Sequence, residues 1–313
     1  MKRVLVTGAA GTLGLQVIKY LLSEGKYEIT GIDLKTKYNI KRLRGYKKRI
    51  NIIYGDLNDE SLINTLVKDH DYVIYLSGIS PVYVNYKNEL GKYDYETVTN
   101  LVNAIKSKNS KCFLLYASTM SIYGNSNNIV SVNTKANISK FDNYSKYKLM
   151  AEKEISKLKN YSIYRLPYIL VDPKVKSNFY AIKSNSKIET IGVLDAAYAF
   201  VLGISNTDKI NKKIFNVTGG EEFRMTYSNY LYKVFRKYGL SMKYVLDLLF
   251  SEKVFNASYC KDGNELEELI HYRHRSLNHY YNSLEKYNRD VKRIIPKIFA
   301  LPFRIIVKGK KDV

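Results

Sequence analysis

The sequence has no tryptophan, two cysteines and five prolines among its 313 residues. Cys112 and Cys260 provide neither a disulfide framework nor a metal-site spacing, which suits a reducing cytosol. No apolar run approaches the roughly 20 residues of a membrane-spanning helix. The first apolar run, Val4–Val6, leads directly into a glycine-rich segment, so we expect a strand there and not a signal peptide. These absences favour a cytoplasmic protein without membrane spans.

Acidic residues are also few, since 29 Asp and Glu stand against 51 Lys and Arg and give a formal net charge of +22. Such a surplus favours anionic partners in general. The lysines are spread along the whole chain, however, and no nucleic-acid-binding motif accompanies them. Tyr, Asn, Ile and Lys are all abundant, so compositional bias accounts for much of the surplus. We therefore predict no specific nucleic-acid partner.

The glycine-rich segment has three glycines, Gly8, Gly11 and Gly14, spaced three residues apart. It follows the apolar run, and apolar residues then recur at helical spacing up to Leu22. Strand, glycine turn and amphipathic helix are the order that a dinucleotide-binding loop needs. We expect Gly8 to permit the tight turn, Gly11 to let backbone N–H groups approach a pyrophosphate, and Gly14 to let helix and strand pack closely. The helix N-terminus would then face the phosphates.

A second apolar run, Tyr27–Ile32, ends in an acidic residue. Asp33 lies 19 residues beyond Gly14, about where a carboxylate holds the ribose diol of NAD. Lys35 and Lys37 would tolerate the 2′-phosphate of NADP, but the carboxylate would repel it. We therefore predict NAD as the cofactor. The alternative, a glycine turn that binds nothing, does not explain the flanking strand, the helix and the acid.

Strands and helices alternate along the rest of the first half of the chain. Further strands are expected at residues 50–54, 72–76 and 112–116, with a helix capped by Asp59 and another over residues 94–107. This alternation implies right-handed crossovers and a parallel sheet. The predicted fold class is α/β, a Rossmann-type doubly wound parallel sheet.

The strand at 112–116 runs into a hydroxyl-rich segment, Ala117–Gly124, at the edge where such sheets bind ligands. A later helix carries Tyr144 and Lys148 four residues apart, on one face. An ammonium near a phenol favours phenolate, so we expect the pKa of Tyr144 to fall from about 10, which makes it usable as an acid or base. Tyr83 and Lys87 share this spacing, but of the two pairs only Tyr144 and Lys148 follow the hydroxyl-rich strand end.

Several segments combine into one pattern: the glycine loop at 7–14, Gly55–Leu57, Ser118–Gly124 and Tyr144–Lys148. Three later ones join them, namely Arg165–Tyr168, Ile191–Ala199 and Phe215–Gly220. The combination resembles the extended short-chain dehydrogenase/reductase family, and within it the NAD-dependent epimerase/dehydratase branch that acts on nucleotide sugars. The resemblance covers about residues 1–235.

The resemblance implies a role for each matching residue. Tyr144 would be the general base that takes a sugar hydroxyl proton as hydride passes to NAD. Lys148 would lower the pKa of that phenol and hold the nicotinamide ribose, and Thr119 would hydrogen-bond the reacting hydroxyl. Asp56 and Leu57 would lie against the adenine. The implied cofactor-binding set is Gly8, Ala10, Gly11, Thr12, Leu13, Gly14, Asp33, Asp56, Leu57, Leu76, Ser77, Gly78, Tyr144, Lys148 and Pro167.

The sequence departs from the family pattern in three places. Asp94 occupies a helix position that is usually Asn, Leu194-Asp195 replaces a pair of aspartates, and the stretch between Arg165 and Asp195 is short. A small substrate lobe is therefore expected. The predicted divisions are an NAD-binding domain at 1–165, a small C-terminal substrate lobe at 166–285 interleaved with it, and a tail at 286–313.

Three histidines, His271, His274 and His279, gather late in the chain. A metal site would need carboxylate or cysteine ligands as well, and Arg273 and Arg275 would repel a cation. We predict no metal site here, and a tyrosine- and arginine-rich helix that packs on the domain.

The segment 289–313 alternates basic and apolar residues, and Pro296 and Pro302 break any long helix. Two interpretations stay open. The segment would lie on an anionic membrane surface as a peripheral contact, or it would pack on the enzyme or on a partner in a homodimer, an assembly that the resemblance implies.

The predicted function is that of an NAD-dependent epimerase or dehydratase whose substrate is a nucleotide sugar with a UDP or dTDP group. One alternative is an NAD(P)-dependent oxidoreductase of a lipid-like or sterol-like alcohol, which the small lobe and the tail favour. The other is a non-catalytic NAD-sensing protein. Thr119, Tyr144 and Lys148 argue against a sensor, because it would have no use for a tuned phenol.

Overall fold

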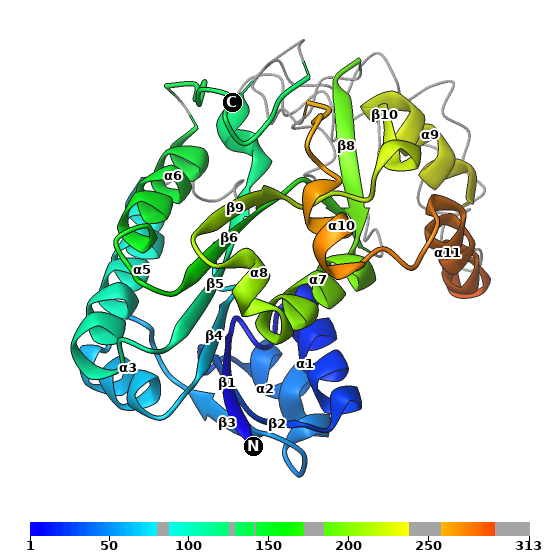
Figure 1. Cartoon of the computed structure of the whole chain (residues 1–313). Helices are drawn as coiled ribbons and strands as arrows, with labels where there is room; N and C mark the ends of the chain where they lie inside the picture. Colours follow the sequence, from blue (N-terminus) through cyan, green and yellow to red (C-terminus); the bar gives the residue numbers. More distant parts are fainter. Residues whose placement is uncertain (80–87, 125–128, 141, 172–184, 238–257, 292–313) are drawn as a thin grey trace.

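The computed structural model describes residues 1–79, 88–124, 129–140, 142–171, 185–237 and 258–291 (Figure 1). A seven-stranded sheet with the order β3-β2-β1-β4-β5-β6-β9 lies at its centre, and every pairing in it is parallel. Its strands are β1 (Lys2–Thr7), β2 (Tyr27–Asp33), β3 (Asn51–Tyr54), β4 (Tyr72–Tyr75), β5 (Phe113–Thr119), β6 (Tyr161–Leu166) and β9 (Lys213–Asn216). The strand order reverses between β1 and β4, which confirms the doubly wound Rossmann-type fold.

Helices cover both faces of this sheet (Figure 1). One face carries α1 (Thr12–Glu24) against α7 (Val193–Ser205), and the other carries α3 (Glu60–Lys68), α5 (Asn88–Lys108) and α6 (Asn143–Ile155) in contact with one another. Three side chains of strand β1 fit this arrangement, and all three are fully buried. Val4 and Val6 pack on the face covered by α1 and α7, and Leu5 packs on the face covered by α3, α5 and α6. Because side chains alternate along a strand, a parallel strand that is covered on both sides must be apolar throughout.

The polar segment after Asp33, which the sequence analysis left unassigned, contains a helix. It forms α2 (Lys37–Leu43) and a short 3-10 turn, η1 (Arg44–Tyr46). Thr36 caps α2, and its hydroxyl accepts a hydrogen bond from the Asn39 N–H at 3.1 Å. The cap was visible in the sequence, but Leu43 is the single buried residue in this helix, so apolar periodicity is missing.

A smaller unit stands beside the carboxyl edge of the large sheet (Figure 1). It has a three-stranded sheet of β10 (Arg224–Thr226), β8 (Lys187–Gly192) and β7 (Tyr168–Leu170), with α9 (Tyr227–Lys237) and α11 (Leu277–Val291). Its core is rich in tyrosine, with Tyr227, Tyr230 and Tyr281 buried beside Leu284. This is the expected small lobe. Remaining elements are η2 (Met120–Tyr123), α8 (Thr207–Ile210), η4 (Glu221–Phe223) and α10 (Glu265–Ile270).

The prediction of a helix around the three histidines is wrong for residues 271–276. Helix α10 ends at His271, which has the left-handed φ of 51°, and α11 begins only at Leu277. The carboxylate of Glu267 accepts the N–H groups of both Tyr272 and Arg273 at 2.9 Å, so these groups are bound outside a helix. The chain between the two helices is therefore extended.

This extended segment does pack on the domain, as expected. Arg275 pairs with the buried carboxylate of Asp195 at 2.9 Å, and the His274 ring lies 4.9 Å from that of Tyr198. Among the described residues there is no group of three His, Cys, Asp or Glu side chains that would hold a metal ion.

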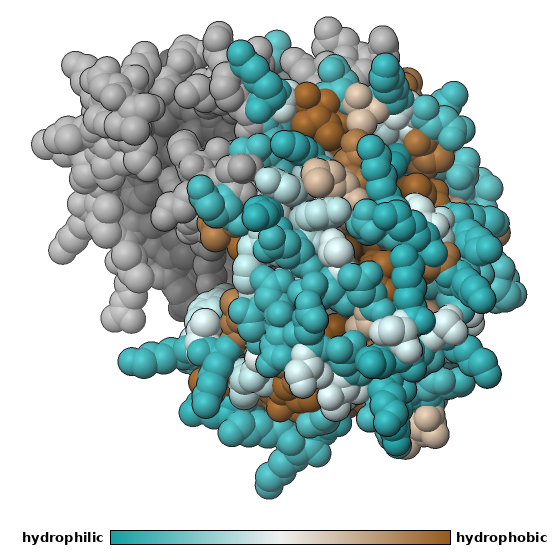
Figure 2. Space-filling model, turned by 90° about the vertical axis from the view of Figure 1, so that its left-hand side faces the viewer, coloured by the Kyte–Doolittle hydropathy of each residue, from teal (hydrophilic) through white to brown (hydrophobic). Residues whose placement is uncertain are grey.

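Figure 2 shows the side formed by α3, α5 and α6. Hydrophilic side chains cover most of it, and apolar residues lie in small separate groups. No helix in the described part of the chain has the length and apolar character needed to cross a bilayer. Most of the basic and apolar tail, residues 292–313, lies outside the described residues, as do Tyr83 and Lys87.

A buried ion pair connects α6 to β6. Arg165 binds both carboxylate oxygens of Glu152, at 3.0 and 2.7 Å, and both side chains are less than a tenth exposed. Ser118, near the end of β5, donates to the same carboxylate at 2.5 Å, and Arg165 donates to the Tyr123 hydroxyl at 2.8 Å. The ends of β5 and β6 are thereby fixed to the helix that carries Tyr144.

We predict that Arg165→Met destabilises the fold by about 3–5 kcal/mol, because it leaves the buried Glu152 carboxylate unpaired. The matched control is Lys157→Met, which breaks the exposed 2.7 Å pair with Glu154; its cost should stay below about 1 kcal/mol. Urea unfolding followed by circular dichroism measures both. Equal costs for the two variants would contradict this account of the buried pair.

Candidate active site

The turns after β1 and β4 touch at the point where the strand order reverses. Gly8 has a φ of +65°, and a Cβ there would lie 3.0 Å from the backbone of Leu76 and Ser77. The Thr7 hydroxyl accepts hydrogen bonds from the N–H groups of Leu76 and Ser77 at 3.1 and 3.2 Å. Glycine therefore permits both the left-handed turn and the close approach that bring the predicted residues of these turns together.

The same loop opens directly into α1. The Gly11 N–H donates to the Gly8 carbonyl at 2.9 Å, and a Cβ on Gly14 would lie 2.3 Å from that carbonyl oxygen. Helix and strand are thus as close as predicted. Gly11 is the N-cap without a side-chain cap, and the first turn has no acidic residue. The positive end of the helix is therefore open to an anionic group such as a pyrophosphate.

Asp33, at the end of β2, is fixed beside this loop. Its carboxylate accepts the Ala10 N–H at 2.9 Å, the Leu34 N–H at 2.8 Å and the Asn39 side-chain amide at 2.9 Å. Burial raises the pKa of Asp33, and the two backbone hydrogen bonds and the charge of Arg42 offset part of that rise. Asn39 went unnoticed in the sequence because its helix, α2, was not assigned.

The predicted adenine-binding pair lies at the end of β3. The Asp56 carboxylate accepts the Asn58 N–H at 2.8 Å and the hydroxyl of Tyr93, which comes from α5, and Leu57 is buried. Tyr93 has a raised pKa because of burial and because it donates to a carboxylate. Nothing in the sequence separates Tyr93 from the other 29 tyrosines, since its partner is 37 positions away.

The hydroxyls of Thr119 and Tyr144 are hydrogen-bonded to each other. Thr119 ends β5, and its oxygen also accepts the Ser121 N–H at 3.1 Å. Tyr144 lies in the first turn of α6, whose N-cap Asp142 accepts the Ser145 N–H at 3.0 Å. The cap fixes where the helix starts, and so it places the phenol at the strand end.

Lys148 lies one turn further along α6 and is 7% exposed. Its ammonium donates to the Ala117 carbonyl at 3.1 Å, and it lies 4.8 Å from the Tyr116 ring centre and 5.9 Å from that of Tyr144. Burial lowers the pKa of Lys148, and the carboxylates of Asp94 and Glu152 act in the opposite direction.

The lowered pKa expected for Tyr144 is wrong for this structure. Burial raises the pKa of the phenol first, and the negative charges of Asp94 and Asp142 raise it further. The Thr119 hydrogen bond offsets only part of this rise. Spacing in the sequence showed the lysine beside the tyrosine, but not the carboxylates that other segments bring to the same place.

Gly78, one of the predicted cofactor-binding residues, lies beside the lysine. A Cβ on Gly78 would be 3.4 Å from the Lys148 nitrogen and 3.7 Å from a carboxylate oxygen of Asp94. A cavity of about 10 Å³, room for about one water molecule, is lined by Asp94, Tyr144 and Lys148 among others. Pro167, the last of the predicted set, is buried between β6 and β7.

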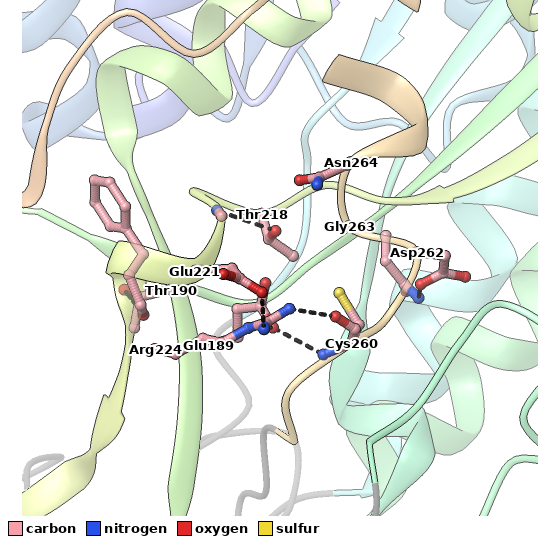
Figure 3. A network of polar contacts seen from close by, with 12 residues as sticks. Glu189, Thr190, Thr218, Glu221, Arg224, Cys260, Asp262, Gly263 and Asn264 are labelled. Carbon is pink, nitrogen blue, oxygen red and sulfur yellow. Dashed lines mark hydrogen bonds and ion pairs between the residues drawn. The ribbon is translucent and has the colours of Figure 1, made fainter. Parts of the chain in front are cut away.

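A late segment that we call the strap, residues 258–264, crosses from the lobe to the large sheet (Figure 3). On the lobe side, the fully buried Glu189 accepts the Cys260 N–H at 2.8 Å and pairs with Arg224 at 3.2 Å. Arg224 also donates to the Cys260 carbonyl at 2.7 Å and to the Glu221 carboxylate at 3.0 Å. The strap therefore completes the polar interior of the lobe.

On its other side the strap is bound to the large sheet. Asp262 accepts the Val132 N–H at 2.6 Å and the Asn216 side-chain amide at 2.8 Å, and Asn216 accepts the Tyr123 hydroxyl at 2.8 Å. Because Tyr123 also binds Arg165, one chain of hydrogen bonds runs from the strap to the ion pair of α6. This connection was missed in the sequence, where residues 241–270 showed no motif.

The predicted residues thus form two ends of one site at the carboxyl edge of the sheet. One end has the glycine loop, Asp33 and Asp56, and the other has Gly78 and the tyrosine–lysine pair. A crevice at a strand-order reversal is where doubly wound sheets bind dinucleotides. The open helix end suits the pyrophosphate, and the fixed carboxylate suits a ribose diol, so the residues present fit NAD. Fold and site together define a dinucleotide-binding protein with a tyrosine–lysine pair at the second end of the site.

Comparison with known proteins gives the family. Residues 4–172, more than half of the chain, match the NAD dependent epimerase/dehydratase family, and the chain belongs to it. It is 31% identical over 163 residues to an uncharacterized UDP-glucose epimerase of Bacillus subtilis, covering 48% of this chain and 50% of that protein. It is 32% identical over 150 residues to UDP-glucuronate 4-epimerase 2 of Arabidopsis thaliana, covering 44% and 32%. The chain therefore matches half or less of the length of these relatives.

Solved structures agree on the fold over nearly the whole chain. A Stenotrophomonas maltophila UDP-glucose-4-epimerase with bound NAD and formylated UDP-arabinopyranose has a TM-score of 0.77 at 14% identity, covering 94% of this chain and 99% of that one. The dTDP-glucose 4,6-dehydratase DesIV of Streptomyces venezuelae, with NAD bound, has a TM-score of 0.78 at 16% identity, covering 92% and 97%. The lobe as well as the large sheet thus has counterparts in these folds.

We predict that Gly14→Ala lowers NAD affinity at least tenfold, because the new methyl group would collide with the Gly8 carbonyl and displace the loop from the helix end. Gly192→Ala is the matched control, since Gly192 has a φ of −67° and nothing lies within 4 Å of its Cβ position. Isothermal titration with NAD measures both. A control that loses as much affinity as the loop variant would refute this interpretation.

Proposed function

We propose that this chain is an NAD-dependent nucleotide-sugar epimerase. The observation that carries the proposal is the convergence of Thr119, Tyr144 and Lys148 beside Gly78, at the carboxyl edge that also has the dinucleotide loop. Two relatives named above are epimerases of UDP-sugars, which supports a substrate with a nucleoside diphosphate. A net charge of +22 also suits such an anion.

In this mechanism Tyr144, as phenolate, takes the proton of one sugar hydroxyl, while Thr119 hydrogen-bonds the same oxygen. Bound NAD would supply the acceptor for the hydride that leaves the carbon and, for return to the opposite face of the ketone, its donor. Tyr144 gives its proton back to the ketone oxygen in that second step. Lys148 keeps a positive charge close to the phenol throughout. One C–H and one O–H bond break and reform, so there is no net oxidation.

Epimerisation fits the described residues better than dehydration does. Loss of water requires an acid for the departing hydroxyl and a base for the proton next to the carbonyl. The two positions directly after Thr119, in the 3-10 turn η2 that follows β5, are Met120 and Ser121. Met120 is buried, and neither side chain ionises near neutral pH. We therefore propose an epimerisation, in which the hydride returns to the sugar and no water is lost.

The direct test is incubation of the NAD-loaded protein with UDP- and dTDP-hexoses, with products identified by NMR. An epimer formed without accumulation of NADH absorbance supports the proposal. A dehydrated sugar, or stoichiometric release of NADH with an alcohol as substrate, would overturn it in favour of a dehydratase or a net oxidoreductase.

Removal of one oxygen tests the role of the phenol. Tyr144→Phe should lower turnover by about 10²–10⁴-fold, the usual contribution of a positioned general base, and should leave NAD binding within about threefold of wild type. Tyr232→Phe, on the exposed side of α9, is the control and should be unchanged in both measurements. Wild-type turnover in the Tyr144 variant would exclude the mechanism.

A further inference from the structure

We propose that Asp94 is a positioning residue that fixes the turn after β4 beside the Lys148 ammonium and, through its charge, shifts the Tyr144-dependent reaction to higher pH. The inference deepens the proposed function and rests on it, because Asp94 acts on the pair assigned to proton transfer there.

The position of Asp94 is fixed from several sides. One carboxylate oxygen accepts the Ile79 N–H at 2.7 Å, which binds α5 to the turn after β4. The Asp94 carbonyl accepts the Thr97 hydroxyl at 2.8 Å, and Thr97 is bonded to Tyr75 of β4 at 2.6 Å. The Cβ position of Gly78 has both groups within reach, with a carboxylate oxygen of Asp94 at 3.7 Å and the Lys148 nitrogen at 3.4 Å. These hydrogen bonds fix the position of the Asp94 carboxylate beside the turn after β4.

Other ionisable groups near the pair already have partners. Glu152 is bound by Arg165, and Asp142 accepts hydrogen bonds from Ser145. Of the carboxylates that favour the charged form of Lys148, Asp94 has the larger effect and Glu152 the smaller one. The remaining ionisable groups around Asp94 are phenols, namely Tyr93 on the same helix, Tyr75 and Tyr116 from the strands, and Tyr95 and Tyr147 from the walls of the small cavity.

The carboxylate affects the two members of the pair in opposite ways. It raises the pKa of Lys148, against the effect of burial, and so favours the charged ammonium. It also raises the pKa of Tyr144, because a negative charge opposes phenolate formation. Since the base is the phenolate, activity should rise with pH through the pKa of Tyr144. Removing the carboxylate charge lowers that pKa, and the rising limb must move to lower pH.

Asp94→Asn separates charge from shape, because the amide oxygen can still accept the Ile79 N–H. In the NAD-loaded enzyme we expect the rising limb of the kcat profile to move about one pH unit lower, with little change in KM. Glu96→Gln is the matched control, since it removes a carboxylate from the exposed side of the same helix, where Glu96 pairs with Lys92 at 3.5 Å. Its profile should coincide with wild type.

Two kinetic results would overturn the proposal: coincident profiles for Asp94→Asn and wild type, or an equal loss at every pH. If no sugar is turned over, the proposed function is wrong, and the role of Asp94 is then tested without turnover, by direct titration of the Tyr144 phenol. Tyrosines labelled at 13Cζ are followed by NMR in the NAD-loaded protein, with Tyr144→Phe identifying the resonance. Asp94→Asn should move that titration to lower pH, and an unmoved titration rejects the role of Asp94.

Discussion

The contact between the turns after β1 and β4 is the constraint on which the site depends. Gly8 lies against the backbone of Leu76 and Ser77, and its carbonyl faces Gly14 with no room for a side chain between them. This approach places the open end of α1 next to the turn that carries Gly78. Every later element of the site is placed relative to that junction, because α5 and α6 bring Asp94 and Lys148 to the far side of the same turn.

The reactive end shows how a buried site determines proton affinity through competing charges. A lysine next to a tyrosine would favour phenolate in isolation. Here the ammonium donates to a carbonyl and lies in the field of two carboxylates, and the half-buried phenol also has two carboxylate charges acting on it. Burial and like charge therefore decide the direction for Tyr144. The positive nicotinamide ring of a bound cofactor would act in the opposite direction on the same phenol.

Local patterns predicted most of the fold and the positions of the site residues. Strands β1 to β5, the glycine turn and the pairing of Tyr144 with Lys148 follow from apolar periodicity and short spacing. Helix α2 was missed because it buries a single residue. The irregular chain at Tyr272–Ser276 was predicted as helix, because the sequence does not show that the Glu267 carboxylate accepts the N–H groups of Tyr272 and Arg273. Asn39, Tyr93 and the effect of Asp94 depend on partners that periodicity does not reveal.

The strap has a consequence for the order in which a nascent chain can fold. The residues up to Leu166, which include the glycine loop and strands β1 to β6, are synthesised first. Strands β1 to β6 pair with one another, and α3, α5 and α6 pack together. Asp262 and Arg273, which bind Asn216 and Thr218, leave the ribosome about a hundred residues later. Until then the hydrogen bonds from these two side chains to the end of β9 and the residues after it are missing. The glycine loop, Asp33 and the turn after β4 can therefore come together during translation before the strap binds the end of β9.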